Sequence, residues 1–227
     1  MTVIEFLKSN RAYFEDFITR STYHSNAIEG SMLSFPETYA ILWNDNSMSI
    51  KATARELYDA INHKYALSLA LGDGSVELRE SLIKAIAEQI NKNINDISGY
   101  RRVRVIIRGA EHIPPAPQQV VSLMMELVYA YNLDIRGGRD PFEREAEFHI
   151  RFERIHPFEG GNGRTGRILL NWGLLLSDVA PAVISIDDRA HYLDLIGHQD
   201  VAGMAGLLRR LSEAEAERIE AFKWRGA

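Results

Sequence analysis

The chain has 227 residues, 46% of them hydrophobic, which suits one domain with a sizeable core. Its net charge is −5 and it contains no block of like charges, which argues against sequence-independent binding of nucleic acid. It contains no cysteine, and this excludes disulfides and thiolate metal sites.

The start of the chain lacks the features of a targeting signal. Residues 1–8 carry neither a basic start nor a long apolar core, which argues against a signal peptide. No stretch approaches the ~18 consecutive apolar residues that cross a membrane as a helix. We therefore expect a soluble, cytoplasmic protein without a membrane partner.

The first predicted helix covers residues 10–28. Apolar residues recur there at helical spacing, and Gly30 supplies a natural stop. Ser25 and Glu29 are four residues apart and therefore share one face of this helix. On its own, a glutamate at a helix end is most simply a solvated surface residue.

Three more helices are expected before the middle of the chain. A short one covers residues 35–42 and is followed by a break at 44–47. Longer ones cover residues 53–71 and 77–93. The buried side of the helix at 53–71 is expected to carry Leu57, Ile61, Tyr65 and Leu69.

Residues 103–108 are the one convincing extended segment. Gly109 can turn the chain, and residues 112–113 can form a return strand, so the pattern predicts a β-hairpin. The prolines within 114–117 end this segment and start a helix that reaches Tyr131.

The most informative stretch is residues 156–167, His-Pro-Phe-Glu-Gly-Gly-Asn-Gly-Arg-Thr-Gly-Arg. Its glycines around Asn162 allow a positive φ and a close approach of the backbone to a ligand, and successive N–H groups can bind an anion. Arg164 and Arg167 are one helical turn apart, so both can point at the same anion. His156 is suited to proton transfer near neutral pH. The stretch therefore predicts transfer of a phosphorus-centred group.

A dinucleotide-binding loop is the main alternative. Gly161, Gly163 and Gly166 form a G-x-G-x-x-G pattern, and Asp187 lies about 20 residues further on. That fingerprint must follow a buried strand. Residues 142–155 are too charged for one and place their apolar residues on one helical face, so we favour the phosphate loop. The other alternative is a glycine-rich surface loop with solvated arginines and no ligand. Twelve consecutive residues of this composition argue against it.

Three helices are expected beyond the loop. Residues 164–177 are nearly all apolar and predict a central buried helix. Asp187 is a candidate N-cap for the next helix, which carries Tyr192. A last helix covers residues 202–223, and no repeat or linker marks a domain boundary.

Residues 156–167 resemble the motif of the Fic family, His-x-Phe-x-acid-Gly-Asn-Gly-Arg-x-x-Arg. The matching residues are His156, Phe158, Gly161, Asn162, Gly163, Arg164 and Arg167. The resemblance implies a mainly α, Fic/Fido-type helical bundle with a small β-hairpin flap, formed by residues 1–227 as a single domain. It also implies an enzyme that moves AMP from ATP to a Ser, Thr or Tyr hydroxyl of a target protein.

The resemblance assigns a role to each residue of the loop. His156 would be the catalytic base, Phe158 would anchor the loop, and residues 103–113 would hold the protein substrate as a flap. The nucleotide would contact Gly161, Asn162, Gly163, Arg164, Gly166, Arg167 and Tyr192. The family's Mg²⁺ ligand is the acid at position 160. Here that residue is Gly160, and the neighbouring Glu159 would replace it only in part.

Ser25 to Gly30 resemble the inhibitory motif of Fic proteins, which implies an inhibitory helix at about residues 10–30. Arg167 needs a counter-ion when ATP is absent, and the motif implies that Glu29 supplies it. Two other functions stay open. Glu29 could orient a water molecule that removes AMP from a modified protein, or the loss of the acid at position 160 could leave an inactive nucleotide-binding regulator. The target and the oligomeric state, a homo-oligomer included, are also open.

Overall fold

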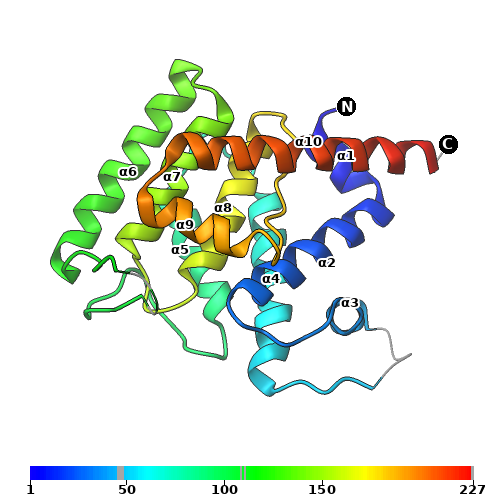
Figure 1. The fold of residues 1–227 in the computed structure, drawn as a ribbon, viewed down its shortest axis with the longest axis horizontal. Helices are drawn as coiled ribbons and strands as arrows, with labels where there is room; N and C mark the ends of the chain where they lie inside the picture. Colours follow the sequence, from blue (N-terminus) through cyan, green and yellow to red (C-terminus); the bar gives the residue numbers. More distant parts are fainter. Residues whose placement is uncertain (45–48, 108, 110, 226–227) are drawn as a thin grey trace.

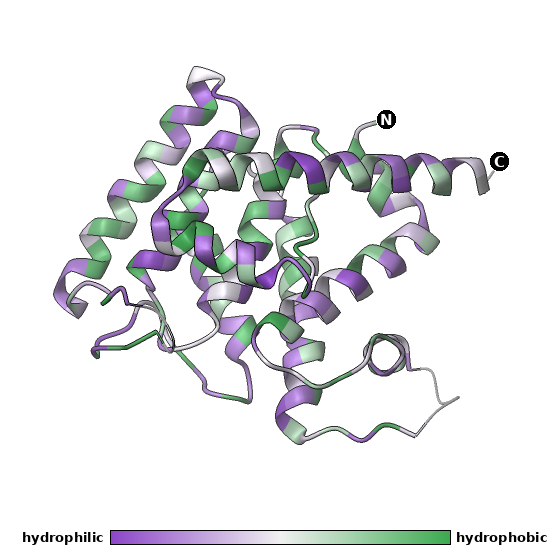
Figure 2. Ribbon diagram, in the orientation of Figure 1, coloured by the Kyte–Doolittle hydropathy of each residue, from purple (hydrophilic) through white to green (hydrophobic). Residues whose placement is uncertain are grey.

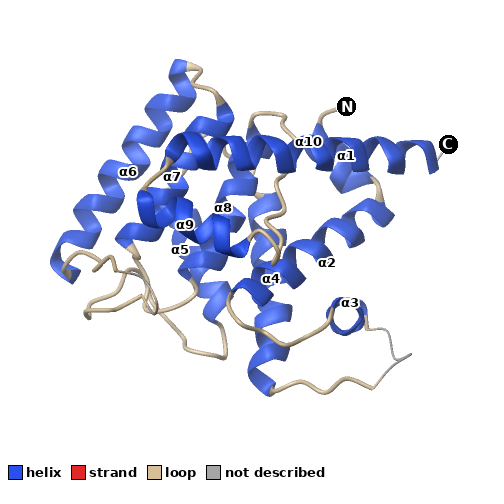
Figure 3. Ribbon diagram, viewed as in Figure 1, coloured by secondary structure: helices blue, strands red, loops and turns tan. Residues whose placement is uncertain are grey.

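A computed structural model describes residues 1–44, 49–107, 109 and 111–225, and over these ranges the chain is helical and contains no strand (Figure 3). The helices are α1 (Val3–Ser9), α2 (Arg11–Ile28), α3 (Phe35–Trp43), α4 (Ala54–Gly72), α5 (Glu80–Asn91), α6 (Pro117–Gly137), α7 (Pro141–Ile155), α8 (Asn162–Leu176), α9 (Arg189–His198) and α10 (Val201–Arg225). The prediction of a mainly helical fold is confirmed.

Helix α8 runs through the middle of the bundle (Figure 1). Its residues from Arg164 to Leu175 are all buried. From Ile168 on, nearly all its residues are apolar and leave no face for water, so the helix is covered on every side. Helix α7 packs along it, and α2, α4 and α5 contact it as well. Figure 2 shows its hydrophobic ribbon enclosed by helices of mixed polarity.

The core contains two clusters of buried apolar side chains, and α8 contributes to both. The larger one joins Leu169 to side chains of α1–α7, including Phe152. The smaller one joins Leu170 to α9 and α10, including Leu208. Because α8 is fixed from both sides, the charged residues at its start are held on a rigid element.

Helix starts coincide with polar residues that act as caps. The side chain of Asn10 accepts a hydrogen bond from the amide of Tyr13 at 2.9 Å, and Ser34 and Thr53 each form a capping box. The N-cap of α9 is Asp188, one residue after the predicted Asp187. Helix α1 was not predicted. None of the described helices combines the length and apolarity that a membrane span requires.

The prediction of a β-hairpin flap at residues 103–113 is wrong for the described part of that segment, which contains no strand. Contacts of Arg101 explain the conformation that this segment adopts instead of a hairpin. The guanidinium of Arg101 donates to the carbonyls of Val103 and Pro115, so side-chain contacts fix both ends of the segment. A two-stranded hairpin without a third strand is marginally stable in water. Residues 108 and 110 lie outside the described residues.

The predicted buried face of α4 is also wrong. Tyr65 is 57% exposed and Leu69 is 37% exposed, whereas Asn62 and His63 are buried. These polar side chains face inward because they have partners there. The amide of Asn62 donates to the carbonyl of Lys92 at 2.6 Å, and the ring of His63 lies 3.1 Å from the hydroxyl of Thr22. The predicted break at 44–47 begins at Asn44, and its other residues lie outside the described part.

A buried polar network constrains the middle of α8. Glu145 accepts from Tyr131 at 2.7 Å and from Arg144 at 2.9 Å, and Arg144 also donates to the carbonyl of Gly173 at 3.0 Å. A Cβ atom at Gly173 would clash with the side-chain oxygens of Tyr131 and Glu145. The network therefore requires glycine at this position.

We expect Gly173→Ala to lower the free energy of unfolding by about 1–3 kcal/mol, because the added methyl group overpacks the network. Gly206→Ala on the exposed side of α10 is the matched control. No atom lies within 4 Å of a Cβ atom there, so the change should be neutral or stabilise by up to ~1 kcal/mol. Urea unfolding measures both. Equal midpoints for the Gly173 variant and the parent would show that the network does not restrict α8.

Candidate functional site

The loop between α7 and α8 is fixed by its own side chains. Asn162 accepts from the amide of Phe158 and donates to its carbonyl, both at 2.9 Å. Phe158 is fully buried against the rings of Tyr100 and Phe152. This is the contact expected of a loop anchor. Asn162, which was expected to contact the nucleotide, here holds the loop backbone.

Helix α8 begins without a side-chain cap. Gly161 precedes it with a φ of 73°, a left-handed conformation that glycine adopts without strain. The first N–H groups of a helix lack partners within the helix, so this turn presents donors and a positive dipole to an anion. Arg164 and Arg167 follow on the same helix, as the sequence predicted.

Arg167 lies in a buried pocket of acceptors. Its Nε donates to the hydroxyl of Ser25 at 2.9 Å, and its Nη2 donates to the Ser25 carbonyl at 3.0 Å and to Glu29 Oε1 at 2.8 Å. Its side chain is 7% exposed, whereas that of Glu29 is 44% exposed. Burial raises the pKa of Glu29, but the charge of Arg167 outweighs this and holds it below its ordinary value. The structure thus brings together Ser25 and Glu29 of α2 with Arg167 of α8.

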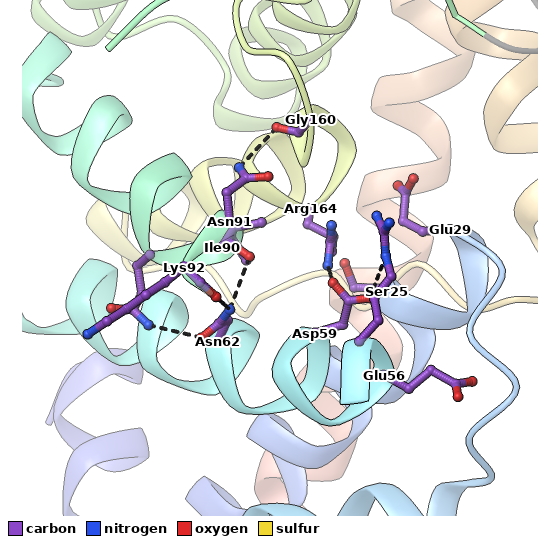
Figure 4. Close-up of polar contacts among 12 residues, drawn as sticks. Ser25, Glu29, Glu56, Asp59, Asn62, Ile90, Asn91, Lys92, Gly160 and Arg164 are labelled. Carbon is purple, nitrogen blue, oxygen red and sulfur yellow. Dashed lines mark hydrogen bonds and ion pairs between the residues drawn. The ribbon is translucent and has the colours of Figure 1, made fainter. Parts of the chain in front are cut away.

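Glu29 also lies directly over the start of α8. A Cβ atom at position 163 would clash with Glu29 Oε1 and would lie 3.0 Å from Arg167. Only glycine at this position lets the carboxylate approach the first helical turn so closely. Glu29 therefore lies against Gly163 in the first turn of α8 as well as on the guanidinium of Arg167. Figure 4 shows Ser25 and Glu29 to the right of Arg164.

His156 ends α7 in a left-handed conformation, with a φ of 50°. Its Nδ1 lies 3.3 Å from the carbonyl oxygen of Glu153. A carbonyl can only accept, so Nδ1 carries the proton and Nε2 carries the lone pair. Burial lowers the pKa of His156 below its ordinary value, so the imidazole is neutral at pH 7. The ring is therefore in the form that a general base requires.

Tyr192 lies beneath Arg167. It is 1% exposed, and its hydroxyl accepts from Arg167 at 3.3 Å and lies 2.7 Å from Nε2 of His149. In this structure the tyrosine supports the arginine from inside the bundle. Its expected contact with adenine stays a prediction.

Glu153 and His149 form a buried layer below the loop. Neither Glu153 Oε1 nor His149 Nδ1 has a hydrogen-bond partner among the described residues. A Cβ atom at Gly166 would lie 2.7 Å from Glu153 Oε1, so α8 approaches this carboxyl closely. Burial raises the pKa of Glu153 to about 8 and lowers that of His149 to about 3. Both side chains are therefore neutral at pH 7.

The structure adds Asp59, which sequence reasoning missed. Asp59 lies on α4 and pairs with Nη1 of Arg164, 105 residues further along the chain. Figure 4 shows this pair beside Ser25 and Glu29. No local pattern marks the aspartate as a site residue, because its significance depends on the packing of α4 against α8.

The described residues do not offer a complete Mg²⁺ site. Gly160 has no side-chain oxygen, and its carbonyl accepts from Asn91 at 3.1 Å. Glu159 is exposed. Over the described residues, no group of three or more acidic or histidine side chains is placed to hold a metal ion. This donor set does not fit a dedicated octahedral site, so Glu159 as a metal ligand stays a prediction.

Residues 77–174, which include the loop and most of α8, match the sequence model of the Fic/DOC family. Over this segment the chain is similar to the Fic/DOC family. Proteins named protein adenylyltransferase Fic share 24% identity with it over 218 residues in Drosophila grimshawi and 26% over 221 residues in Drosophila mojavensis. Each alignment covers 94% of this chain. The chain spans about 43% of the length of the first relative and 42% of the second.

Solved structures support the same family fold. A Fic domain-containing signaling protein from Bacteroides thetaiotaomicron aligns with a TM-score of 0.81 at 26% identity, over 96% of this chain and 91% of that one. Fic-1 from C. elegans aligns with a TM-score of 0.79 at 26% identity, over 94% of this chain and 65% of that one. The Fic-type helical bundle is confirmed, without strands over the described residues.

The buried carboxyl of Glu153 makes stability depend on pH. Its pKa is about 8 in the folded protein, against an ordinary value of 4.5. Between these values the unfolded chain releases the proton while the folded chain keeps it, so stability falls as pH rises. Glu153→Gln imitates the neutral acid and does not titrate. We expect its stability relative to the parent to increase from pH 5 to pH 8, by about 1–3 kcal/mol.

Thermal unfolding at several pH values measures this difference. Glu143→Gln, an exposed change on the same helix, controls for effects of pH on the rest of the protein. If the stability of Glu153→Gln relative to the parent does not increase between pH 5 and pH 8, the carboxyl of Glu153 does not keep its proton in the folded protein.

Proposed function

We propose that this protein transfers AMP from ATP to a Ser, Thr or Tyr hydroxyl of a target protein, and that Glu29 holds it in an inactive state. The observation that carries the proposal is the Glu29–Arg167 pair in front of the first turn of α8. An arginine, a row of helix N–H groups and a neutral histidine meet there, and a carboxylate occupies the place where phosphates would bind. The names of the distant relatives support the reaction class.

In the proposed reaction, the phosphates of ATP lie against the first turn of α8 and the side chains of Arg164 and Arg167. The target hydroxyl oxygen attacks the α-phosphorus, and the bond to the leaving pyrophosphate breaks. Nε2 of His156 takes the hydroxyl proton. The arginines stabilise the negative charge that accumulates on the pyrophosphate. Asn162 contributes by fixing the loop.

Glu29 would inhibit by competition for space and charge. Its carboxylate takes a donor of Arg167 and covers Gly163. It is also half exposed at the C-terminal end of α2, with an oxygen that can face water. Removal of this side chain would therefore free the anion site without disturbing the core. Its position at the helix start also keeps hydrolysis of AMP–protein bonds as the second candidate, with Glu29 orienting a water molecule.

We further propose that the target protein docks on the segment 103–113. Val103 is 50% exposed, Ile106 is 87% exposed and Ile113 is 77% exposed, so apolar side chains are available for a partner. The segment is tied to the loop of His156 through Arg101, whose Nε donates to the His156 carbonyl at 2.8 Å. A target bound there would lie beside the proposed base.

We expect Glu29→Gly to increase AMP transfer about a hundredfold, which corresponds to about 2.7 kcal/mol at the barrier. Glu29→Gln keeps the size of the side chain and removes its charge, so it should give an intermediate increase. The measurement is incubation with α-labelled ATP and a cell lysate. His156→Ala in the Glu29→Gly background should lower labelling by about 10²–10⁴-fold and leave ATP affinity within a few-fold.

Three results distinguish the candidate functions. Labelled protein that depends on His156 supports transfer. Release of label from protein that was modified beforehand supports hydrolysis. Tight binding of ATP by Glu29→Gly with neither activity, over a range of Mg²⁺ and ATP concentrations, supports a nucleotide-binding regulator and contradicts the proposal.

The glycine at position 160 predicts weak use of Mg²⁺. In the Glu29→Gly background, Gly160→Asp should lower the Mg²⁺ concentration for half-maximal transfer about tenfold, the effect of one added charged contact. A Cβ atom there would lie 3.2 Å from Asn91 Oδ1, so Gly160→Asn controls for the space that the new side chain takes. Glu159→Ala should raise the Mg²⁺ concentration for half-maximal transfer only if Glu159 helps to bind the ion. Identical Mg²⁺ dependence in the Asp and Asn variants would show that a carboxylate at this position is dispensable.

A further inference from the structure

Arg164 points from the first turn of α8 into the bundle, where it pairs with Asp59 of α4. The contact is largely closed to water, since the side chain of Arg164 is 7% exposed and that of Asp59 is 13% exposed. Figure 4 shows the aspartate approaching the guanidinium from below, on the side away from the loop at Gly160. A buried arginine with one fixed partner has a fixed orientation.

The pairing uses only one part of the guanidinium. Asp59 accepts from Nη1. The Nε group is buried and has no hydrogen-bond partner among the described residues. Nε and Nη2 together form the side-on edge with which arginine binds a carboxylate or phosphate through two parallel hydrogen bonds. A buried donor without an acceptor is costly, and among the described residues none supplies an acceptor for Nε, so an acceptor brought by a ligand would relieve that cost.

Asp59 and Glu29 differ in how firmly they are held. Glu29 lies at the end of α2 and is half exposed. Asp59 lies within α4, which packs against α2, α5 and α8. Its second oxygen lies 3.7 Å from Arg55, which is 71% exposed. The aspartate therefore stays on Arg164 when an anion arrives, whereas Glu29 occupies space that the anion needs.

We propose that Asp59 is a positioning residue that holds Arg164 by Nη1 and directs its Nε–Nη2 edge to a phosphate group of ATP. The inference rests on the proposed binding of ATP at this loop. Asp59 does not touch the nucleotide. It also balances one of two arginine charges that lie one helical turn apart, and so lowers the cost of keeping both ready for the phosphates.

The test measures binding of ATP and of adenosine to the Glu29→Gly protein, without an acceptor protein. We expect Asp59→Asn to weaken ATP binding about tenfold and Asp59→Ala to weaken it more, because Asn retains an acceptor for Nη1 but no charge. Affinity for adenosine, which has no phosphate, should be unchanged. In an Arg164→Ala background, Asp59→Asn should have no further effect on ATP, since the aspartate acts through the arginine.

Arg55→Ala is the matched control, because it removes the exposed neighbour of Asp59 and should change ATP affinity less than twofold. If Asp59→Ala fails to fold, the ATP affinities of Asp59→Asn and of its combination with Arg164→Ala test the inference. Unchanged or tighter ATP binding by Asp59→Asn overturns the inference, as does an equal loss with and without Arg164. Because binding needs no transfer, absence of AMP transfer would contradict the proposed reaction and leave this result standing.

Discussion

Two buried arginines at the start of α8 are the constraint around which the site is built. A guanidinium is charged at every accessible pH, so Arg164 and Arg167 must each find acceptors inside the bundle. Helix α4 provides Asp59 for one, and α2 provides Ser25 and Glu29 for the other. These contacts explain why segments distant in sequence meet at one helix end. The acceptor of Arg164, Asp59, lies within α4 and is 13% exposed, whereas the acceptor of Arg167, Glu29, lies at the end of α2 and is 44% exposed.

The features that were predicted from the sequence are those that depend on local chemistry. The predicted helix starts at residues 10 and 53 coincide with Asn10 and Thr53, whose side chains cap the next few amides in the structure. The apolar run of α8 predicted its central place, because such a helix cannot face water. Ser25 and Glu29 were identified through their spacing and a family resemblance, and the structure places them on Arg167.

The features that were missed depend on partners distant in the chain. The inner face of α4 contains the polar residues His63 and Asn62, because their hydrogen-bond partners lie on α2 and just after α5, far away in the sequence. Asp59 was missed for the same reason. The segment at 103–113 has a strand-like composition, but extended residues form a strand only where another strand pairs with them. Here the side chain of Arg101 contacts the two ends instead.

Arg101 has a mechanical consequence. Its amide donates to the carbonyl of Pro157, and its guanidinium contacts the carbonyls of His156, Val103 and Pro115. One side chain therefore sets the spacing between an outer surface segment and the backbone that carries the imidazole. A polypeptide bound to that segment would be held at a fixed distance from the imidazole of His156. The residue that faces Nε2 would then be selected by its distance along the polypeptide from the bound part. The sequence around the modified hydroxyl would matter less than this distance.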